Sequence, residues 1–467
     1  MANAQVNLQF ITNRLGNRSL VFNNYKYRVK SRRDDRVYWI CSTSRCPARV
    51  TTVNDLLVST TNNHNHPADR MQIEVHDLMQ TIKRRCRDEL TPIPTIYSQE
   101  ITSIRQGDWT DESRQLAESL QTFHSAKNSL YTQRCKTIPA LPKTLADINL
   151  PDQWTTTTAD EKFLVADDGM QDRLLIFATR QSLAHLASAD TIYADGTFYA
   201  CPSLFKQLYT IHGFVDGAMY PLVYALLPGK SEAIYRRMFG LLINACQRHN
   251  LTLSPNTIFL DFETAPRNAA LHHFPGIIPK RCFFHFTQCI WRKTQESGLQ
   301  VPYQEIDSVQ QLVRRAAVLP LLPAEDVEDV WFYTLEDFDA ADSGVDATTF
   351  TDYVTEYWVE GNRHLWNHFE TEGPRTTNNL EGWHSKLNKH FNHPHPNIYR
   401  LIDVIKRIQA ANEVQQVQYA AGGKRATRKR KYKEIDRRLD DLKTRLNNGE
   451  ITALAYADAA SHLIHLG

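Results

Sequence analysis

Residues 191–198 read Thr-Ile-Tyr-Ala-Asp-Gly-Thr-Phe, an apolar run that ends in Asp195. Such a short run is typical of a buried β-strand. An acid at the end of a buried run is costly unless it is paired or bound to a metal. Residues 257–261, Thr-Ile-Phe-Leu-Asp, repeat the pattern and end in Asp261. The sequence therefore predicts two strands that each present a carboxylate at their end.

The segments around these runs predict a mixed sheet covered by helices. Starting from the strand that ends at Asp195, the expected order is β-β-β-α-β-α-β, which matches a ribonuclease H-like α/β fold. In that fold the first and fourth strands are neighbours, so Asp195 and Asp261 should face one another. The segments behind this order are strands at 173–178, 207–215, 219–227 and 281–286, and helices at 231–249 and 264–273.

A third acid, Glu381, lies in residues 377–384, Thr-Asn-Asn-Leu-Glu-Gly-Trp-His. It follows a largely helical stretch, expected to be an insertion before the last helix of the sheet domain. Three carboxylates suit Mg²⁺ or Mn²⁺, and two such ions about 4 Å apart support phosphoryl transfer. Three alternatives remain open. Asp195 could be a turn residue before Gly196, and Glu381 could be an acid that stabilises the start of a helix. Glu263 could serve as another metal ligand.

A second group of candidate metal ligands lies near the N-terminus. Cys41, Cys46, His64 and His66 have the spacing Cys-x4-Cys-x17-His-x-His, and two thiolates with two imidazoles suit tetrahedral Zn²⁺. The His-x-His end predicts an extended segment rather than a helix. The preceding segment is basic and is expected to contact DNA phosphates, although some fingers bind proteins instead; its basic residues are Lys26, Arg28, Lys30, Arg32 and Arg33.

Three further residues near the acids have open roles. Cys282 and His285 are three apart at the end of the strand expected over 281–286. One Cys/His pair cannot complete a zinc site, so a structural or DNA-positioning role is favoured. Trp383 could stack on an unpaired base, or pack in the core.

The net charge of +2 conceals basic ends and an acidic middle. Residues 1–70 hold 11 Lys and Arg against 4 Asp and Glu, and residues 424–447 hold the same numbers. Basic ends favour nucleic-acid contact, and residues 424–433 favour nuclear import or DNA contact. Without an apolar leader or a membrane-length apolar run, we expect a soluble intracellular protein with reduced cysteines, located in the nucleus.

These motifs together resemble those of Mutator-like-element (MULE) transposases. That family has Asp-Gly-Thr-Phe, Asp-Phe-Glu, Cys-x-x-His and Thr-Asn-Asn-x-x-Glu-Gly in this order, and all four have counterparts between about residues 140 and 395, the last one residue tighter before its acid. The N-terminal unit separately resembles a FLYWCH-type zinc finger. The resemblance implies a DDE transposase with catalytic acids Asp195, Asp261 and Glu381.

The resemblance further implies a partner and a reaction. The partner is double-stranded DNA, as element terminal repeats and as target, and a homo-oligomer would hold two ends together. The reaction is metal-dependent cleavage of the ends and joining of the freed 3′-hydroxyl to target DNA. Two other functions stay open: a transposase-derived transcriptional regulator that binds DNA without cutting it, and a scaffold that binds partners through the acidic residues 325–360.

The expected organisation has six parts. These are the zinc finger at 1–70, a helical linker or second DNA-binding or dimerisation element at 71–140, the first part of the catalytic core at 141–286, the helical insertion at 287–370, the final core helix with the third acid at 371–400, and a basic helical tail at 401–467.

Overall fold

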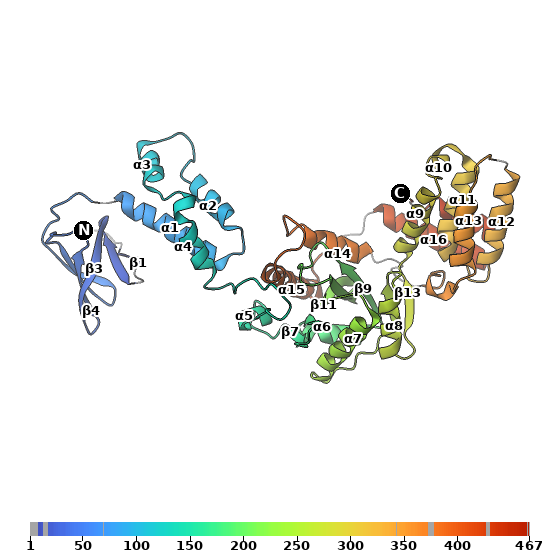
Figure 1. Cartoon of the computed structure of the whole chain (residues 1–467), viewed down its shortest axis with the longest axis horizontal. Helices are drawn as coiled ribbons and strands as arrows, with labels where there is room; N and C mark the ends of the chain where they lie inside the picture. Colours follow the sequence, from blue (N-terminus) through green and yellow to red (C-terminus); the bar gives the residue numbers. More distant parts are fainter. Residues whose placement is uncertain are drawn as a thin grey trace. The chain divides into compact units, whose positions relative to one another are not determined.

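The computed structural model describes residues 8–12, 17–68, 70–341, 343–371, 378–425, 430–464 and 466. Thr376 and Thr377 of the motif before Glu381, and residues 426–429 of the basic segment, lie outside the described residues. The chain divides into two compact units, Met1–Ala140 and Leu141–Gly467, which are described separately (Figure 1). Within the described ranges, no helix combines the length and apolar character needed to cross a bilayer.

Unit 1 begins with an antiparallel sheet whose six strands lie in chain order. Asn23 and Asn24, and again Asn54 and Asp55, have positive φ, as the two-residue turns that match strand twist require. Trp39, 1% exposed, lies in the core and its Nε1 donates to Thr52 Oγ1 over 2.9 Å. The strands are β1 (Gln9–Thr12), β2 (Arg18–Phe22), β3 (Tyr25–Arg33), β4 (Arg36–Cys41), β5 (Arg49–Val53) and β6 (Leu56–Thr61).

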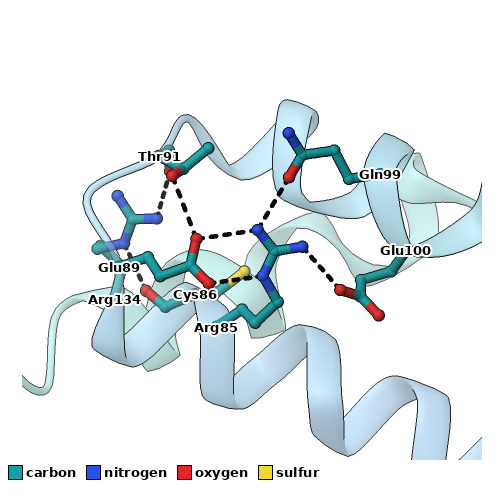
Figure 2. A network of polar contacts seen from close by, with 7 residues as sticks. All are labelled: Arg85, Cys86, Glu89, Thr91, Gln99, Glu100 and Arg134. Atoms are coloured by element: carbon teal, nitrogen blue, oxygen red, sulfur yellow. Dashed lines mark hydrogen bonds and ion pairs between the residues drawn. The ribbon is translucent and has the colours of Figure 1, made fainter. Parts of the chain in front are cut away.

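Four helices complete unit 1: α1 (Arg70–Asp88), α2 (Ile93–Thr102), α3 (Asp111–Ser119) and α4 (Phe123–Arg134). Figure 2 shows the polar network that joins α1, α2 and α4. The Arg85 guanidinium donates to Glu89, to Glu100 over 2.7 Å and to Gln99 over 2.8 Å. Arg134 donates to the carbonyls of Cys86 and Thr91. Arg85 is therefore a structural clamp between helices.

Unit 2 contains a seven-stranded mixed sheet in the order β13-β12-β9-β10-β11-β8-β7. The expected element order from β9 to β13 is confirmed, and β9 pairs in parallel with β12. Asp216 and Gly217, both with positive φ, form the tight turn between β10 and β11. The strands are β7 (Leu164–Asp167), β8 (Leu175–Phe177), β9 (Thr191–Thr197), β10 (Gln207–Val215), β11 (Ala218–Leu227), β12 (Thr257–Leu260) and β13 (Ile278–Arg281).

Helices lie on both faces of this sheet. One face buries apolar side chains such as Ile192, Ala194 and Leu260 against α6 (Arg180–Ser188), α7 (Glu232–Gln247) and α8 (Thr264–His273). The other face meets α14 (Asn378–Asn388), whose Leu380 packs on Tyr193 and Phe259. Short α5 (Asp152–Thr155) packs against α15 (Ile398–Ala420), and Gln409 of α15 donates to Ser182 over 3.0 Å.

A helical body with its own apolar core forms the rest of unit 2. It combines the residues expected as an insertion with C-terminal helices, because Leu439, Tyr456 and Ala457 lie in the same core. The expected tail at 401–467 therefore contributes α15 to the sheet domain and its last helices to this body (Figure 1). The helices are α9 (Phe283–Glu296), α10 (Pro302–Glu305), α11 (Asp307–Val318), η1 (Leu319–Leu321), α12 (Val327–Ala340), α13 (Thr348–Val354), η2 (Thr355–Val359), η3 (Arg363–Leu365), α16 (Arg430–Asn447) and α17 (Ala453–Ser461).

The expected strand over residues 281–286 is wrong. β13 ends at Arg281, Cys282 is the residue that caps α9, and the helix runs from Phe283. The run of aromatic residues resembles a strand, but the buried positions Phe286, Ile290 and Thr294 follow the period of a helix. His285 therefore lies in the first turn of a helix.

Candidate active site and metal centre

The two strand acids lie at the same edge of the sheet. Tyr193 of β9 pairs with Phe259 of β12, and their rings stack with centroids 4.8 Å apart, so these side chains share a face. Side chains alternate along a strand, and Asp195 and Asp261 each follow two residues later. The alternation thus directs the Asp195 carboxylate to the face that α14 covers, and Asp261, which directly follows β12, lies near enough to Asp195 for their charges to interact.

The third acid reaches this edge from α14. Leu380, fully buried, anchors the helix on the rings of Tyr193 and Phe259. The adjacent Glu381 lies with its Oε1 3.5 Å from Nε2 of His285. The structure therefore brings Asp195, Asp261 and Glu381 to one edge of the sheet, from two strands and a helix.

A chain of polar contacts links Asp195 to the sheet interior. Asp195 Oδ2 lies 3.4 Å from His384 Nδ1, and His384 Nε2 lies 3.0 Å from Thr210 Oγ1. Thr210 Oγ1 is also 3.0 Å from His212 Nε2. Thr210, His212 and His384 are buried, so the Asp195 side chain is held by a network that water does not reach freely.

The acids crowd negative charge at this edge. Burial, together with the charges of Glu263 and Asp195, raises the pKa of Asp261. Burial and the charge of Asp195 raise the pKa of Glu381, although His285 and His384 oppose this. A bound cation would relieve that repulsion, and carboxylates are the ligands that Mg²⁺ and Mn²⁺ prefer. The chemistry of these acids therefore suits a hard divalent ion, although in the described chain their oxygen atoms are not gathered closely enough to share one.

His285 supplies positive charge to the same place. Burial by itself would lower its pKa, but the neighbouring Cys282, Asp195 and Glu381 outweigh burial and raise the pKa to about 9. Cys282 is fully buried, and its backbone N–H donates to the Leu260 carbonyl over 3.1 Å. The Cys282–His285 pair therefore ties the start of α9 to the end of β12 beside the acids.

Glu263 and Trp383 have other neighbours. Glu263 accepts hydrogen bonds from Lys230 and from the Tyr235 hydroxyl, the latter over 3.3 Å, so its carboxylate is engaged on the α7 side. Trp383 packs edge-on against His212 and at a tilt against Tyr224, with centroids 5.2 and 5.8 Å apart. These contacts are those of a packing residue.

A pocket of about 530 Å³ opens beside Glu381 and His384. It is polar and aromatic in character. Its other lining residues are Tyr199, Ser385, Asn388, Lys389 and Phe391. A ring, a hydroxyl and an ammonium group next to the acids can accommodate a nucleotide of a DNA strand.

In unit 1 the four expected zinc ligands converge. Cys41, Cys46, His64 and His66 each offer one donor atom, and these atoms lie within 4.8 Å of one another. The distances are 3.2 Å from Cys41 Sγ to His66 Nε2, 3.4 Å from Cys46 Sγ to His64 Nδ1, and 3.3 Å between the two histidine nitrogens. Tetrahedral zinc with ordinary bond lengths needs edges of about 3.4–3.8 Å. The site fits Zn²⁺.

Neighbouring groups orient both imidazoles. His64 Nε2, the nitrogen away from the ligand cluster, contacts the Tyr27 hydroxyl at 2.7 Å, and His66 Nδ1 contacts the Pro67 carbonyl at 2.8 Å. Tyr25 stacks on the His64 ring with centroids 3.4 Å apart. Such outer contacts fix the tautomer that binds the metal. Among the described residues, this is the only cluster of three or more such donors close enough to share one ion.

The predicted basic residues all lie on β3, beside this site. The register with β4 shifts between Val29 and Ser31, which leaves Lys30 as an extra residue in a bulge. None of these basic residues forms an ion pair with a carboxylate in the described part of the chain, so their charges are available to phosphates. Arg28, Lys30, Arg32 and Arg33 are exposed, and Lys26 is half-buried.

The sequence reasoning did not identify Thr210 and His212. The signal was present, because the two polar residues alternate with apolar ones in the strand Gln207–Val215 and therefore share a face. The sequence could not show that Thr210 contacts His384, because the two residues are 174 positions apart.

Comparison with protein families adds independent findings. Residues 10–66 match the FLYWCH zinc finger domain, and the match includes all four zinc ligands. Residues 191–289 match the MULE transposase domain, a range that contains Asp195, Asp261, Cys282 and His285. A comparison with curated proteins finds no match. The chain therefore carries an N-terminal FLYWCH zinc finger and a MULE transposase domain, which supports a transposase-type function.

Proposed function

We propose that this protein is a DDE-type DNA transposase with a ribonuclease H-like core. The observation that carries the proposal is the meeting of Asp195, Asp261 and Glu381 at one sheet edge, in a chain with a MULE transposase domain. The strand order supports this fold. If β9 to β13 are numbered one to five along the chain, their order across the sheet is 3-2-1-4-5, which is β11-β10-β9-β12-β13.

In this proposal the three acids hold Mg²⁺ or Mn²⁺. The bound ions would activate water or a DNA 3′-hydroxyl and stabilise the leaving oxygen. His384 and Thr210 keep the Asp195 carboxylate in place. His285, 3.5 Å from Glu381, would orient that carboxylate, and its protonated form would offset negative charge as the phosphate reacts.

The zinc finger would place the DNA. Its unpaired cations on β3 can contact phosphates while the strand approaches a groove to read bases. The DNA partners would be the element ends and the target site, held by a homo-oligomer. The basic residues 424–433 would direct the protein to the nucleus.

Three substitutions test the catalytic assignment. We expect Asp195→Asn, Asp261→Asn and Glu381→Gln each to lower Mn²⁺-dependent cleavage of the terminal repeats that flank the gene by at least a hundredfold, because each removes an anionic metal ligand. DNA binding and thermal stability should stay close to wild type. The matched control is Asp172→Asn, because the Asp172 side chain is exposed. Asp168 is unsuitable as a control because it forms an ion pair with Arg237. Cleavage that survives a triad substitution refutes that residue's role.

A non-cutting DNA-binding regulator is the second candidate. Its support is the separate zinc finger, which can bind DNA whether or not unit 2 cuts it. Specific binding of the terminal repeats, with no cleavage or strand transfer by the wild type in Mg²⁺ or Mn²⁺, would favour this function.

A further inference from the structure

Two arginines near the sheet edge that carries the acids lie within electrostatic range of one another. Arg281 is the last residue of β13 and pairs with Leu260, the residue before Asp261. Arg267 lies in the helix α8, which packs against β13. Each side chain is partly buried. Their charges interact, since the proximity of Arg267 adds to burial in lowering the pKa of Arg281.

Neither guanidinium is neutralised by a carboxylate among the described residues. Arg281 lies over the Phe262 ring, 4.8 Å from its centroid. Asp261 is near enough to influence its pKa but forms no ion pair with it. Arg267 donates to the neutral Asn268 over 3.2 Å, and its buried Nε has no hydrogen-bond partner in the described chain.

Besides Phe262 and Asn268, a third side chain near the two arginines carries no charge. Cys289 of α9 is half-buried, and burial raises the pKa of its thiol despite the nearby Arg281 and Arg292. Two like charges and an unsatisfied N–H therefore share a partly desolvated place. This is unfavourable for stability, whereas several other partly buried arginines in the described chain have acidic partners, such as Arg85 with Glu89 and Glu100.

We propose that Arg267 and Arg281 bind a backbone phosphate of the DNA strand that enters the active site. Guanidinium groups match phosphate geometry and bind it through paired N–H donors. A phosphate supplies the missing negative charge and the missing acceptor. Because Arg281 lies near enough to Asp261 for their charges to interact, the phosphate would lie close to the acids, and the pair would help to set the register of the strand. This inference rests on the proposed DNA-cutting function for the identity of the strand.

The test measures DNA binding without requiring cleavage. Full-length wild type, Arg267→Gln, Arg281→Gln and the double variant are titrated with a fluorescent DNA duplex of arbitrary sequence, over a range of salt, with zinc retained and no Mg²⁺ or Mn²⁺. Arg180→Gln is the matched control, because Arg180 is exposed at the start of α6, which packs on β10 and β11.

We expect each Arg→Gln variant to bind about tenfold more weakly. The slope of log K against log salt should become shallower by about 0.9 for each phosphate that the variant no longer neutralises. The melting temperature should stay unchanged or rise, because like charges have been separated. The control should match the wild type. Unchanged affinity and slope, or a fall in melting temperature that accounts for weaker binding, would overturn the phosphate site.

Cleavage assays on the same proteins separate the two proposals. If the wild type cuts DNA and both arginine variants bind and cut like it, the phosphate site is wrong and the transposase proposal stands. If the arginine-dependent binding is observed but the wild type never cuts, the phosphate site stands and the catalytic proposal fails. Absence of any DNA binding by the wild type overturns the phosphate site as well.

Discussion

His212 shows how a single residue near the acids can determine the stability of the sheet domain. Its side chain is 1% exposed and its ring contacts Thr210 and His384. Burial, reinforced by the nearby His384, lowers its pKa well below the ordinary value of 6.5. The folded protein therefore keeps this imidazole neutral at pH values where an unfolded chain would protonate it.

The pH dependence follows from this difference. Because the unfolded state binds the extra proton, the contribution of His212 to stability is complete above about pH 6.5 and is lost as pH falls below it, with a slope of up to about 1.4 kcal/mol per pH unit. We expect His212→Gln to reduce this slope in denaturant unfolding between pH 6.5 and 5. His364→Gln, an exposed control in the same unit, should keep the wild-type slope, and a slope unaltered by His212→Gln would contradict the argument.

At the scale of elements, charged residues join helices in unit 1. Residues 71–140 are expected to form a helical linker or a second DNA-binding or dimerisation element, and several arginines lie near the end of α1. Arg85 contacts Glu89 and Glu100, and hydrogen bonds to these carboxylates raise its pKa above its ordinary, already high value. The neighbouring Arg84 is exposed. The two adjacent arginines thus have different roles.

This difference can be measured. We expect Arg85→Ala to destabilise the packing of α1 on α2 by about 2 kcal/mol, because Glu89 and Glu100 lose their shared partner in a partly buried place. Amide hydrogen exchange should accelerate in α1, α2 and α4. Arg84→Ala should change stability by less than about 0.5 kcal/mol; equal effects of the two substitutions would show that the network contributes little.

At the scale of the whole molecule, zinc and the acids belong to different compact units. The finger has a small core around Trp39, and a sheet of that size depends on its metal for stability. Unit 2 has two large apolar cores and no such dependence among its described residues. Loss of zinc should therefore affect one unit only.

Calorimetry of the full chain tests this independence. We expect a zinc chelator to abolish the unfolding transition of the finger, because the finger then loses the free energy of zinc binding, about 10 kcal/mol. The transition of unit 2 should stay unchanged. Cys41→Ser should reproduce the effect without chelator, while Cys135→Ser, at an exposed cysteine of unit 1, should not. Retention of zinc by Cys41→Ser would refute the site.

The sequence by itself determined much that is local. Ligand spacing identified the finger, because four donors of suitable chemistry in 26 residues leave few other interpretations. Apolar alternation and turn residues predicted the strands from β9 to β12 and the order of elements through β13, but they placed the last strand too late in the sequence. The run Cys-Phe-Phe-His was misread as a strand, because a short aromatic run fits both periods until the buried positions farther along the helix are known.

Only the tertiary structure decided which distant residues meet. Sequence separation does not encode the partners of Glu381, Thr210 or Arg281, which depend on strand pairing and on how α14 and α8 pack against the sheet. Likewise, the sequence does not reveal which acidic residue, if any, lies beside a given basic residue. Packing made Arg85 a clamp with two carboxylates and left Arg267 and Arg281 without one, because burial and partner geometry, rather than residue type, determine whether a charge stabilises the fold or remains available to a ligand.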